Sequence, residues 1–192
     1  MLNPGFVTRK ALANWQDVPA FLPHEKHQTV IHTSHPENIL PLIANFDIRQ
    51  DAVIRRLMSL RQIPKKLLRN KQAGSMSNFG LHSFTLLTQS ASEICYGLRG
   101  QFWRTDFNLE NMPDASAFQT PVAAGKAKLL LRYQGTERAP GQHELSTETF
   151  VYCSDRSTQL KMTAYWLVIR AGSGWIRKRT LKAVKSNIEG LE

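Results

Sequence analysis

The segment 126–170, KAKLLLRYQGTERAPGQHELSTETFVYCSDRSTQLKMTAYWLVIR, changes its hydrophobic spacing part-way along. Up to residue 154 apolar and polar residues alternate, which is typical of strands with one buried face. A turn with proline and glycine at 137–141 divides this part into two long strands, 126–136 and 142–154. From about Arg156 the apolar residues recur at helical spacing instead. The segment therefore predicts a long antiparallel hairpin followed directly by a helix.

The C-terminal helix is predicted in two parts. Two apolar stripes are separated by the sequence AGSG at 171–174, and glycine weakens the interior of a helix. We therefore expect an interruption at this point. The first stripe is Met162, Tyr165, Trp166 and Ile169, and the second contains Ile176, Leu181, Val184 and Ile188.

Toward the N-terminus the pattern gives one strand and then two helices. Residues 24–33 alternate and end in β-branched side chains, which predicts a first strand. Ser34 and Glu37 fit a capping box that starts a helix, and Pro41 shortens or kinks this helix. A second helix is expected over about 47–61.

Between these helices and the long hairpin, two more strands are expected. Segments 81–89 and 93–100 predict a hairpin, and 108–124 is polar and irregular. The element order indicates the α+β class: a curved antiparallel sheet closed by a long C-terminal helix, with two short helices after the first strand. We expect residues 1–22 to be a leader segment and residues 23–192 to form one domain.

The composition excludes several classes of protein. A chain of 192 residues with 42% hydrophobic content can bury one sizeable core and is not wholly disordered. No apolar run approaches the roughly 18 residues of a membrane-spanning helix. Two cysteines are too few for a disulfide scaffold, which favours a reducing cytoplasm.

The net charge of +10 is concentrated in two stretches. Residues 52–71 contain seven Lys and Arg, residues 156–188 contain eight, and neither stretch contains an acid. The plainer interpretation is two helices with solvated cationic faces. The alternative is a surface for an anionic membrane, and nucleic acid is less favoured because no stacking platform or known motif is present. The candidate cationic surface consists of Arg55, Arg56, Lys65, Lys66, Arg177, Lys178, Arg179, Lys182 and Lys185.

Four short motifs occur in a fixed order along the chain. They are IHTSHPE at 31–37, GLRGQFWR at 97–104, LSTET at 145–149, and YWLVIR at 165–170 followed by Ser173 and Gly174. Together they resemble the START-like superfamily, also called SRPBCC or helix-grip proteins, and in particular its polyketide cyclase-like branch. The resemblance covers residues 23–188. It implies a sheet that wraps around the C-terminal helix and leaves a ligand cavity between the two.

Period-2 alternation indicates which side chains face that helix. The odd-numbered residues of 129–133 and 145–151 share one face, and the opposite face suits water and an Arg132–Glu148 pair. Phe150 and Tyr152 interrupt this outer face, where they would meet the leader or a partner. The inward side chains either line a mostly apolar ligand pocket or fill one another's space as a solid core. The candidate pocket consists of Leu57, Phe84, Leu86, Tyr96, Leu98, Trp103, Leu129, Leu131, Tyr133, Thr147, Thr149, Val151, Met162, Tyr165, Trp166 and Ile169.

The sequence contains no recognisable catalytic or metal motif. Four histidines lie within 24–35, but His24 and His32 on one strand face would be about 26 Å apart, too far to share an ion. Cys95 and Cys153 are isolated and are interpreted as structural thiols. Phosphate loops, dinucleotide fingerprints and nucleophile elbows are missing, so we expect no cofactor.

Three functional hypotheses follow. The leading one is non-enzymatic binding, transport or sequestration of a small hydrophobic or lipid-like ligand between the sheet and the last helix. The alternative is a cyclase- or dehydratase-like enzyme in the same pocket, which requires at least two polar side chains converging inside it. The third is docking of the basic surface on an anionic membrane. The identity of the ligand and the oligomeric state are left open.

Overall fold

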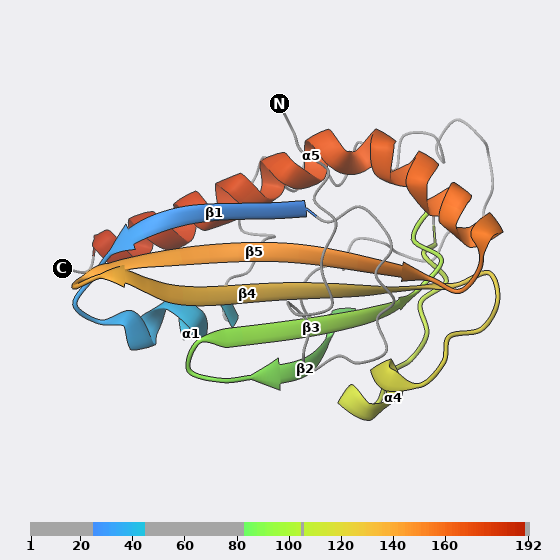
Figure 1. The fold of residues 1–192 in the computed structure, drawn as a ribbon, viewed down its shortest axis with the longest axis horizontal. Coiled ribbons are helices and arrows are strands. Elements are labelled where there is room, and N and C mark those ends of the chain that lie inside the picture. Colours follow the sequence, from blue (N-terminus) through green and yellow to red (C-terminus); the bar gives the residue numbers. More distant parts are fainter. Residues whose placement is uncertain (1–24, 45–82, 105, 191–192) are drawn as a thin grey trace.

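A five-stranded antiparallel sheet crossed by one long helix makes up most of the part of the chain that the structure describes (Figure 1). The computed structural model describes residues 25–44, 83–104 and 106–190, and this part of the chain is an α+β fold as predicted. The elements are β1 (Glu25–His32), the 3-10 helix η2 (Pro36–Asn38), α1 (Ile39–Ala44), β2 (Thr85–Gln89), β3 (Glu93–Gly100), α4 (Ala115–Gln119), β4 (Ala127–Ala139), β5 (Gln142–Cys153) and α5 (Arg156–Glu189).

The first strand of the described chain pairs with the last one. The strand order is β1-β5-β4-β3-β2, and every pair is antiparallel. The predicted hairpin of β4 and β5 is confirmed, and it turns at Gly141, whose φ of 72° suits glycine. β1 adds to the free side of β5, with Glu25 opposite Thr149 and His32 opposite Gln142. This pairing brings together segments more than one hundred residues apart in the sequence.

The long helix α5 is continuous, so the predicted interruption at 171–174 is wrong. Asp155 caps its start by accepting hydrogen bonds from the Thr158 amide at 2.8 Å and the Thr158 hydroxyl at 2.7 Å. The 34 residues of α5 extend for about 50 Å along the sheet. A Cβ at Gly174 would lie 2.7 Å from Glu25 Oε1, whereas one at Gly172 would meet nothing within 4 Å. Gly174 therefore permits close packing on β1, and that packing outweighs the weak helix propensity of the segment.

The helical segment after the first strand has His35 as its N-cap, and not Ser34 as the capping box predicted. The helical segment begins at η2 after His35, which makes no side-chain capping bond. Instead, the Thr33 hydroxyl accepts a hydrogen bond from the His35 amide at 3.0 Å, and Glu37 contacts the His35 ring. Pro41 lies within α1, which has only six residues. The expected leader at 1–22 and the expected helix at 47–61 lie outside the described residues.

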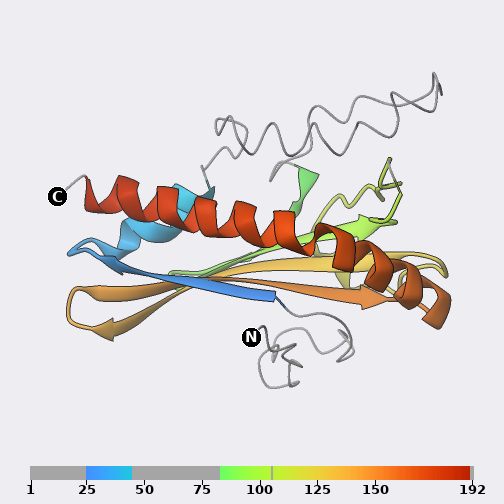
Figure 2. The ribbon, with the colours of Figure 1, turned by 90° about the horizontal axis from the view of Figure 1, so that it is seen from above.

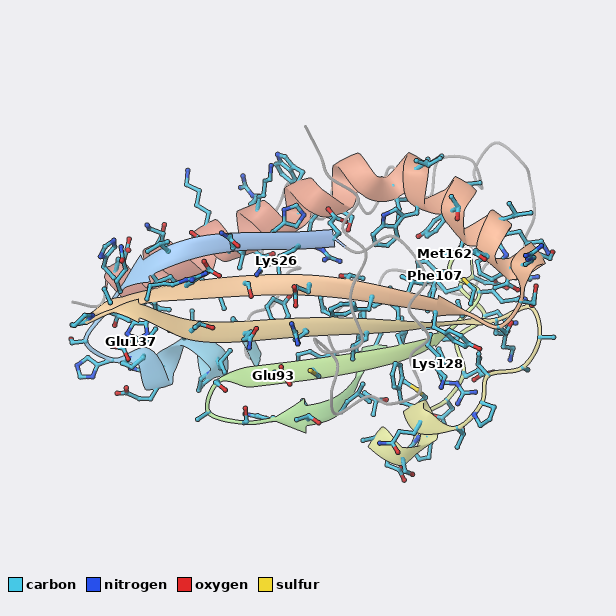
Figure 3. All side chains as sticks on the ribbon, in the orientation of Figure 1. Lys26, Glu93, Phe107, Lys128, Glu137 and Met162 are labelled. Atoms are coloured by element: carbon cyan, nitrogen blue, oxygen red, sulfur yellow. The ribbon has the colours of Figure 1, made fainter. Side chains whose placement is uncertain are left out.

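α5 lies across one face of the sheet, which we call the inner face (Figure 2). Two apolar clusters join α5 to this face. One cluster lies under the last turns of α5, where α1 closes the end of the sheet, and the other lies under its first turns, where Met162 is labelled in Figure 3. The first includes Ile31, Ile39, Ile43, Ile94, Tyr96, Leu131, Tyr133, Leu145, Leu181, Val184 and Ile188, and the second includes Leu98, Phe102, Ala127, Val151, Met162 and Trp166.

The opposite, outer face of the sheet carries a third apolar cluster beside α4. Phe150 belongs to this cluster with Phe118 of α4, Leu130 and Leu87, and the Arg132 guanidinium carbon lies 5.7 Å from the centroid of its ring. A Cβ at Gly97 would lie 2.6 Å from the Phe118 ring, and its absence lets α4 approach the sheet. Phe150 is an apolar residue on the polar outer face because it packs in a cluster with Phe118 of α4.

The rest of the outer face is polar, but its side chains are much less exposed to solvent than expected. Arg132 donates a hydrogen bond from Nε to Glu148 Oε2 at 2.9 Å, so the predicted cross-strand pair is confirmed. Glu93 and Lys128 also lie on this face (Figure 3). Lys128 is buried, with its ammonium 5.4 Å from the centroid of the Phe118 ring. Long aliphatic stems and ion pairs cover much of the backbone here.

Candidate functional site

Polar side chains interrupt the apolar inner face below the middle of α5. They lie in two neighbouring rows across the sheet: His27, Thr147 and Tyr133 are cross-strand neighbours, and Glu25 lies opposite Thr149. Arg177 extends from α5 into electrostatic range of Glu25 and Tyr133. We call Glu25, His27, Tyr133, Thr147, Thr149 and Arg177 the inner polar cluster.

Glu25 and His27 form the most defined contact of the inner polar cluster. Their spacing of two residues along β1 places both side chains on the inner face. His27 Nε2 lies 2.6 Å from Glu25 Oε1, within hydrogen-bond distance. The Cβ that Gly174 lacks would lie 3.3 Å from His27 Nε2 as well as against Glu25. α5 therefore holds this carboxylate–imidazole pair against the sheet.

Arg177 is directed toward the sheet, so its expected place on the cationic surface is wrong. It lies four residues before Leu181 and seven before Val184, and these spacings place it on the buried side of α5. Burial lowers the pKa of its guanidinium, and the negative charge of the Glu25 carboxylate acts in the opposite direction. Since arginine stays protonated in proteins, Arg177 supplies a fixed positive charge to the inner polar cluster.

Three buried atoms of the inner polar cluster have no hydrogen-bond partner: Glu25 Oε2, Thr149 Oγ1 and Arg177 Nη1. The Thr147 hydroxyl is also buried, and it interacts with the neighbouring Tyr133 phenol. Within the described residues one more buried side-chain atom is without a hydrogen-bond partner, Nε of Arg99, and that atom has Glu110 Oε2 at 2.6 Å as an ionic neighbour. The unpartnered polar atoms of the described chain are therefore concentrated at one place.

Two tyrosines border this place. The Tyr133 side chain is buried next to Thr147 and is affected by the charge of Arg177. Burial raises the pKa of Tyr133, and burial likewise raises that of Tyr96, so both phenols are protonated at neutral pH. Each phenol is therefore a hydrogen-bond donor on the inner face.

Most of the predicted pocket residues do lie on or beside the inner face. Leu86 lies opposite Tyr96 but is 46% exposed, because β2 is an edge strand, so it does not belong to the buried inner face as expected. Leu57 lies outside the described residues. Those buried are Tyr96, Leu98, Leu131, Tyr133, Thr147, Thr149, Val151, Met162 and Trp166, and those partly buried against the apolar clusters are Phe84, Trp103, Leu129, Tyr165 and Ile169.

The predicted cationic surface is divided by the structure. Lys178, Arg179 and Lys182 are exposed on α5. Lys185 is half-buried and donates to the Val30 carbonyl oxygen at 2.8 Å. The four basic residues predicted between 55 and 66 lie outside the described chain.

The described residues contain no group of three or more His, Cys, Asp or Glu side chains suited to a metal ion. No described helix is both long and apolar enough to cross a lipid bilayer. Cys95 and Cys153 are both free, and burial raises the pKa of each thiol to about 12.

No family model, curated protein or solved structure matches this chain.

Glu25, His27 and Arg177 belong to the inner polar cluster but were not predicted to lie there. For Arg177 a signal was present, because its spacing from Leu181 and Val184 is that of one helix face. For Glu25 and His27 the available signal was the alternation of β1, which places residues two apart on the same face of the strand. Their neighbours Thr147 and Thr149 follow only from the register between β1 and β5.

Proposed function

We propose that this protein binds a small molecule with an apolar body and a polar group, held between the sheet and α5. The fold would then be a helix-grip fold of the START-like kind. The observation that carries the proposal is the set of three unpartnered buried atoms in the inner polar cluster, Glu25 Oε2, Thr149 Oγ1 and Arg177 Nη1.

The energetic argument starts from the cost of such atoms. A buried polar group without a hydrogen bond destabilises a fold by about 1–3 kcal/mol, and more when the group is charged. Native proteins contain few of them, and those that persist are often explained by a ligand, water or function. Thr149 is 0% exposed and Glu25 is 8% exposed, so bulk water does not compensate these groups directly. A ligand that supplies the missing hydrogen bonds would relieve this cost.

The arrangement of donors and acceptors limits the ligand. Arg177 Nη1 donates only, Glu25 Oε2 accepts when ionised, and the Thr149 hydroxyl does both. A matching polar group has an acceptor oxygen for Arg177 and a hydroxyl for Glu25. Apolar clusters flank the inner polar cluster along α5 on both sides, with Trp166 before it and Leu181 after it. A molecule with a hydroxy-carbonyl or carboxyl end and a hydrocarbon body has this distribution of polarity.

Native mass spectrometry of the purified full chain, with a long-chain fatty acid and the corresponding fatty alcohol as probes, tests the proposal. Thr149→Val removes one unpartnered hydroxyl at nearly constant volume. Thr180→Val is the matched control, because Thr180 is also buried but its hydroxyl donates to the Ile176 carbonyl oxygen at 3.0 Å within α5.

We expect the wild type to retain a co-purified molecule or to take up a probe with a rise in melting temperature. Thr149→Val should weaken uptake without lowering the stability of the free protein, and Thr180→Val should leave uptake unchanged. A wild type that never carries or takes up either probe, or two variants that bind alike, would overturn the proposal.

The Glu25–His27 pair supports a second candidate, acid–base catalysis on the same ligand. An imidazole held by a carboxylate can accept a proton from carbon next to a carbonyl, and Tyr133 can donate a hydrogen bond to the carbonyl oxygen. The nearness of these groups to Arg177 supports this candidate, because the enzymatic alternative needs at least two polar side chains at one place.

Proton exchange tests this second candidate without a known substrate. The wild type and His27→Gln are incubated in heavy water with a long-chain methyl ketone, and deuterium uptake next to the carbonyl is measured. Exchange catalysed by the wild type and lost in His27→Gln supports a base at this position. If the ketone binds and both proteins leave its exchange at the background rate, His27 is not a base.

A further inference from the structure

The outward side of α5 carries an exposed apolar band that the inner polar cluster does not explain. Leu160 is 73% exposed, Leu167 is 69% exposed and Val168 is 81% exposed, which is far above the exposure of the aliphatic residues on the inner side. Their spacing of seven and eight residues places all three on one side of the helix. Trp175 continues this side two turns further along the helix and is 39% exposed.

A cationic band follows the apolar one along the same side of α5. Lys178, Arg179 and Lys182 are exposed in the next two turns, and Lys161 is exposed near the helix start. The two bands meet where the Arg179 guanidinium lies 5.4 Å from the centroid of the Trp175 ring. No acid occurs between residues 156 and 188, so the side is uniformly basic or neutral over nine turns.

We propose that this side of α5 docks the protein on an anionic lipid bilayer. Leu160, Leu167 and Val168 would enter the boundary between headgroups and acyl chains, and Trp175 would lie at headgroup level, where tryptophan is enriched. Lys178 and its neighbours would meet the negative headgroups. This inference goes beyond ligand binding and does not depend on it.

The chemistry of the two bands favours a bilayer over other anionic partners. Nucleic acid attracts cations but offers no apolar phase to Leu160, Leu167 and Val168. A neutral protein surface would cover the aliphatic residues but leave the cationic band without partners. An anionic bilayer satisfies both bands. Docking also needs no rearrangement, because the buried side of α5 holds the sheet through Met162 and Val184.

Vesicle co-sedimentation of the full chain tests the proposal. The probes are vesicles of phosphatidylcholine alone and vesicles of phosphatidylcholine and phosphatidylglycerol in equal parts. One variant combines Leu167→Ser with Val168→Ser, and the other combines Lys178→Ala with Arg179→Ala. All four positions are exposed, so circular dichroism should show unchanged folding.

A charge-matched control separates local docking from net charge. Arg104→Ala with Arg138→Ala also removes two positive charges, from exposed side chains that lie outside α5. We expect wild-type binding only to the anionic vesicles and weakening with salt. The Lys178 and Arg179 double variant should bind roughly 10-fold to 30-fold more weakly, and the control should differ much less from wild type. The Leu167 and Val168 double variant should lose roughly tenfold.

Several results would overturn the proposal. Equal binding to both vesicle types, or equal losses in the charge variant and its control, would show that this side of α5 is not a specific docking surface. Self-association of the wild type that disappears in the Leu167 and Val168 double variant, without vesicle binding, would assign the apolar band to a second copy of the chain. Binding to nucleic acid but not to vesicles would assign the cationic band to that partner.

Discussion

Exchanging glycine for alanine at two positions of α5 tests how tightly the helix rests on the Glu25–His27 pair. Both Gly172 and Gly174 lie inside the helix, two residues apart. A Cβ at Gly172 meets nothing within 4 Å, and one at Gly174 would lie 2.7 Å from Glu25 Oε1. The two substitutions therefore have the same effect on helix propensity and different effects on the inner polar cluster.

The expected magnitudes follow from these contacts. Replacing an interior helical glycine by alanine favours the helix by about 1 kcal/mol, so Gly172→Ala should stabilise the protein by about that amount. In Gly174→Ala the same gain is opposed by displacement of the Glu25 carboxylate from His27, and a hydrogen bond to a charged group contributes about 2 kcal/mol. We expect Gly174→Ala to be destabilised by about 1 kcal/mol relative to wild type. The two variants should thus differ by about 2 kcal/mol.

Urea denaturation followed by circular dichroism measures this difference, with equal slopes showing that the unfolded states are comparable. In thermal melts the two variants should differ by about 4–8 °C for a chain of this size. If Gly174→Ala stabilises the protein as much as Gly172→Ala, the Glu25 carboxylate moves aside freely and the reasoning is wrong.

Three further predictions concern charge and thiols. Arg132→Leu removes the ionic partner of the buried Glu148 and should destabilise the protein by about 3 kcal/mol. Adding Glu148→Leu should recover much of this loss in the free energy of unfolding. A double variant as unstable as the single one would contradict the stabilising role of the pair. The amide hydrogen bonds at the start of α5 hold the pKa of Asp155 below its usual 3.8, so its contribution to stability is present above that pH and is lost as the pH falls. Asp155→Asn should therefore flatten the fall in urea midpoint below about pH 4, and an unchanged acid profile would refute the assignment. Burial raises the pKa of Cys95 and of Cys153 to about 12, so an aromatic disulfide reagent at mildly alkaline pH should modify them only on unfolding; prompt modification of the native protein would show that the thiols are accessible.

The strands and the last helix were predictable because their signals are local. Alternation over 142–154 predicted β5 almost to the residue, and the capping residue Asp155 separates it from α5 in both sequence and structure. Two local signals were misleading. The sequence AGSG at 171–174 indicates a break, but packing of Gly174 on β1 keeps the helix intact. Ser34 and Glu37 fit a capping box, but the N-cap is His35, whose amide donates to the Thr33 hydroxyl and whose ring contacts Glu37.

The candidate site was predictable only in part. The odd-numbered residues of β4 and β5 were placed on the inner face by alternation alone, and Tyr133, Thr147 and Thr149 proved to belong to the inner polar cluster. Glu25 reaches the same place through pairing of β1 with β5, a contact between distant parts of the chain. Arg177 stands in a basic run, which predicts an exposed side chain, but it shares the helix face of Leu181 and Val184, which is turned toward the sheet.

By itself, the sequence determined the α+β class, the strand pairs joined by short turns, and the side of each strand that is buried. These properties depend on residues close together in the chain, so the spacing of hydrophobic residues and the residue types of the turns are enough to predict them. Only the tertiary structure decided that β1 lies beside β5, that α5 is unbroken over Gly174, and that a carboxylate, an imidazole and a guanidinium meet on the inner face. Such contacts join residues far apart in the sequence, and their free energy depends on packing that no local pattern records.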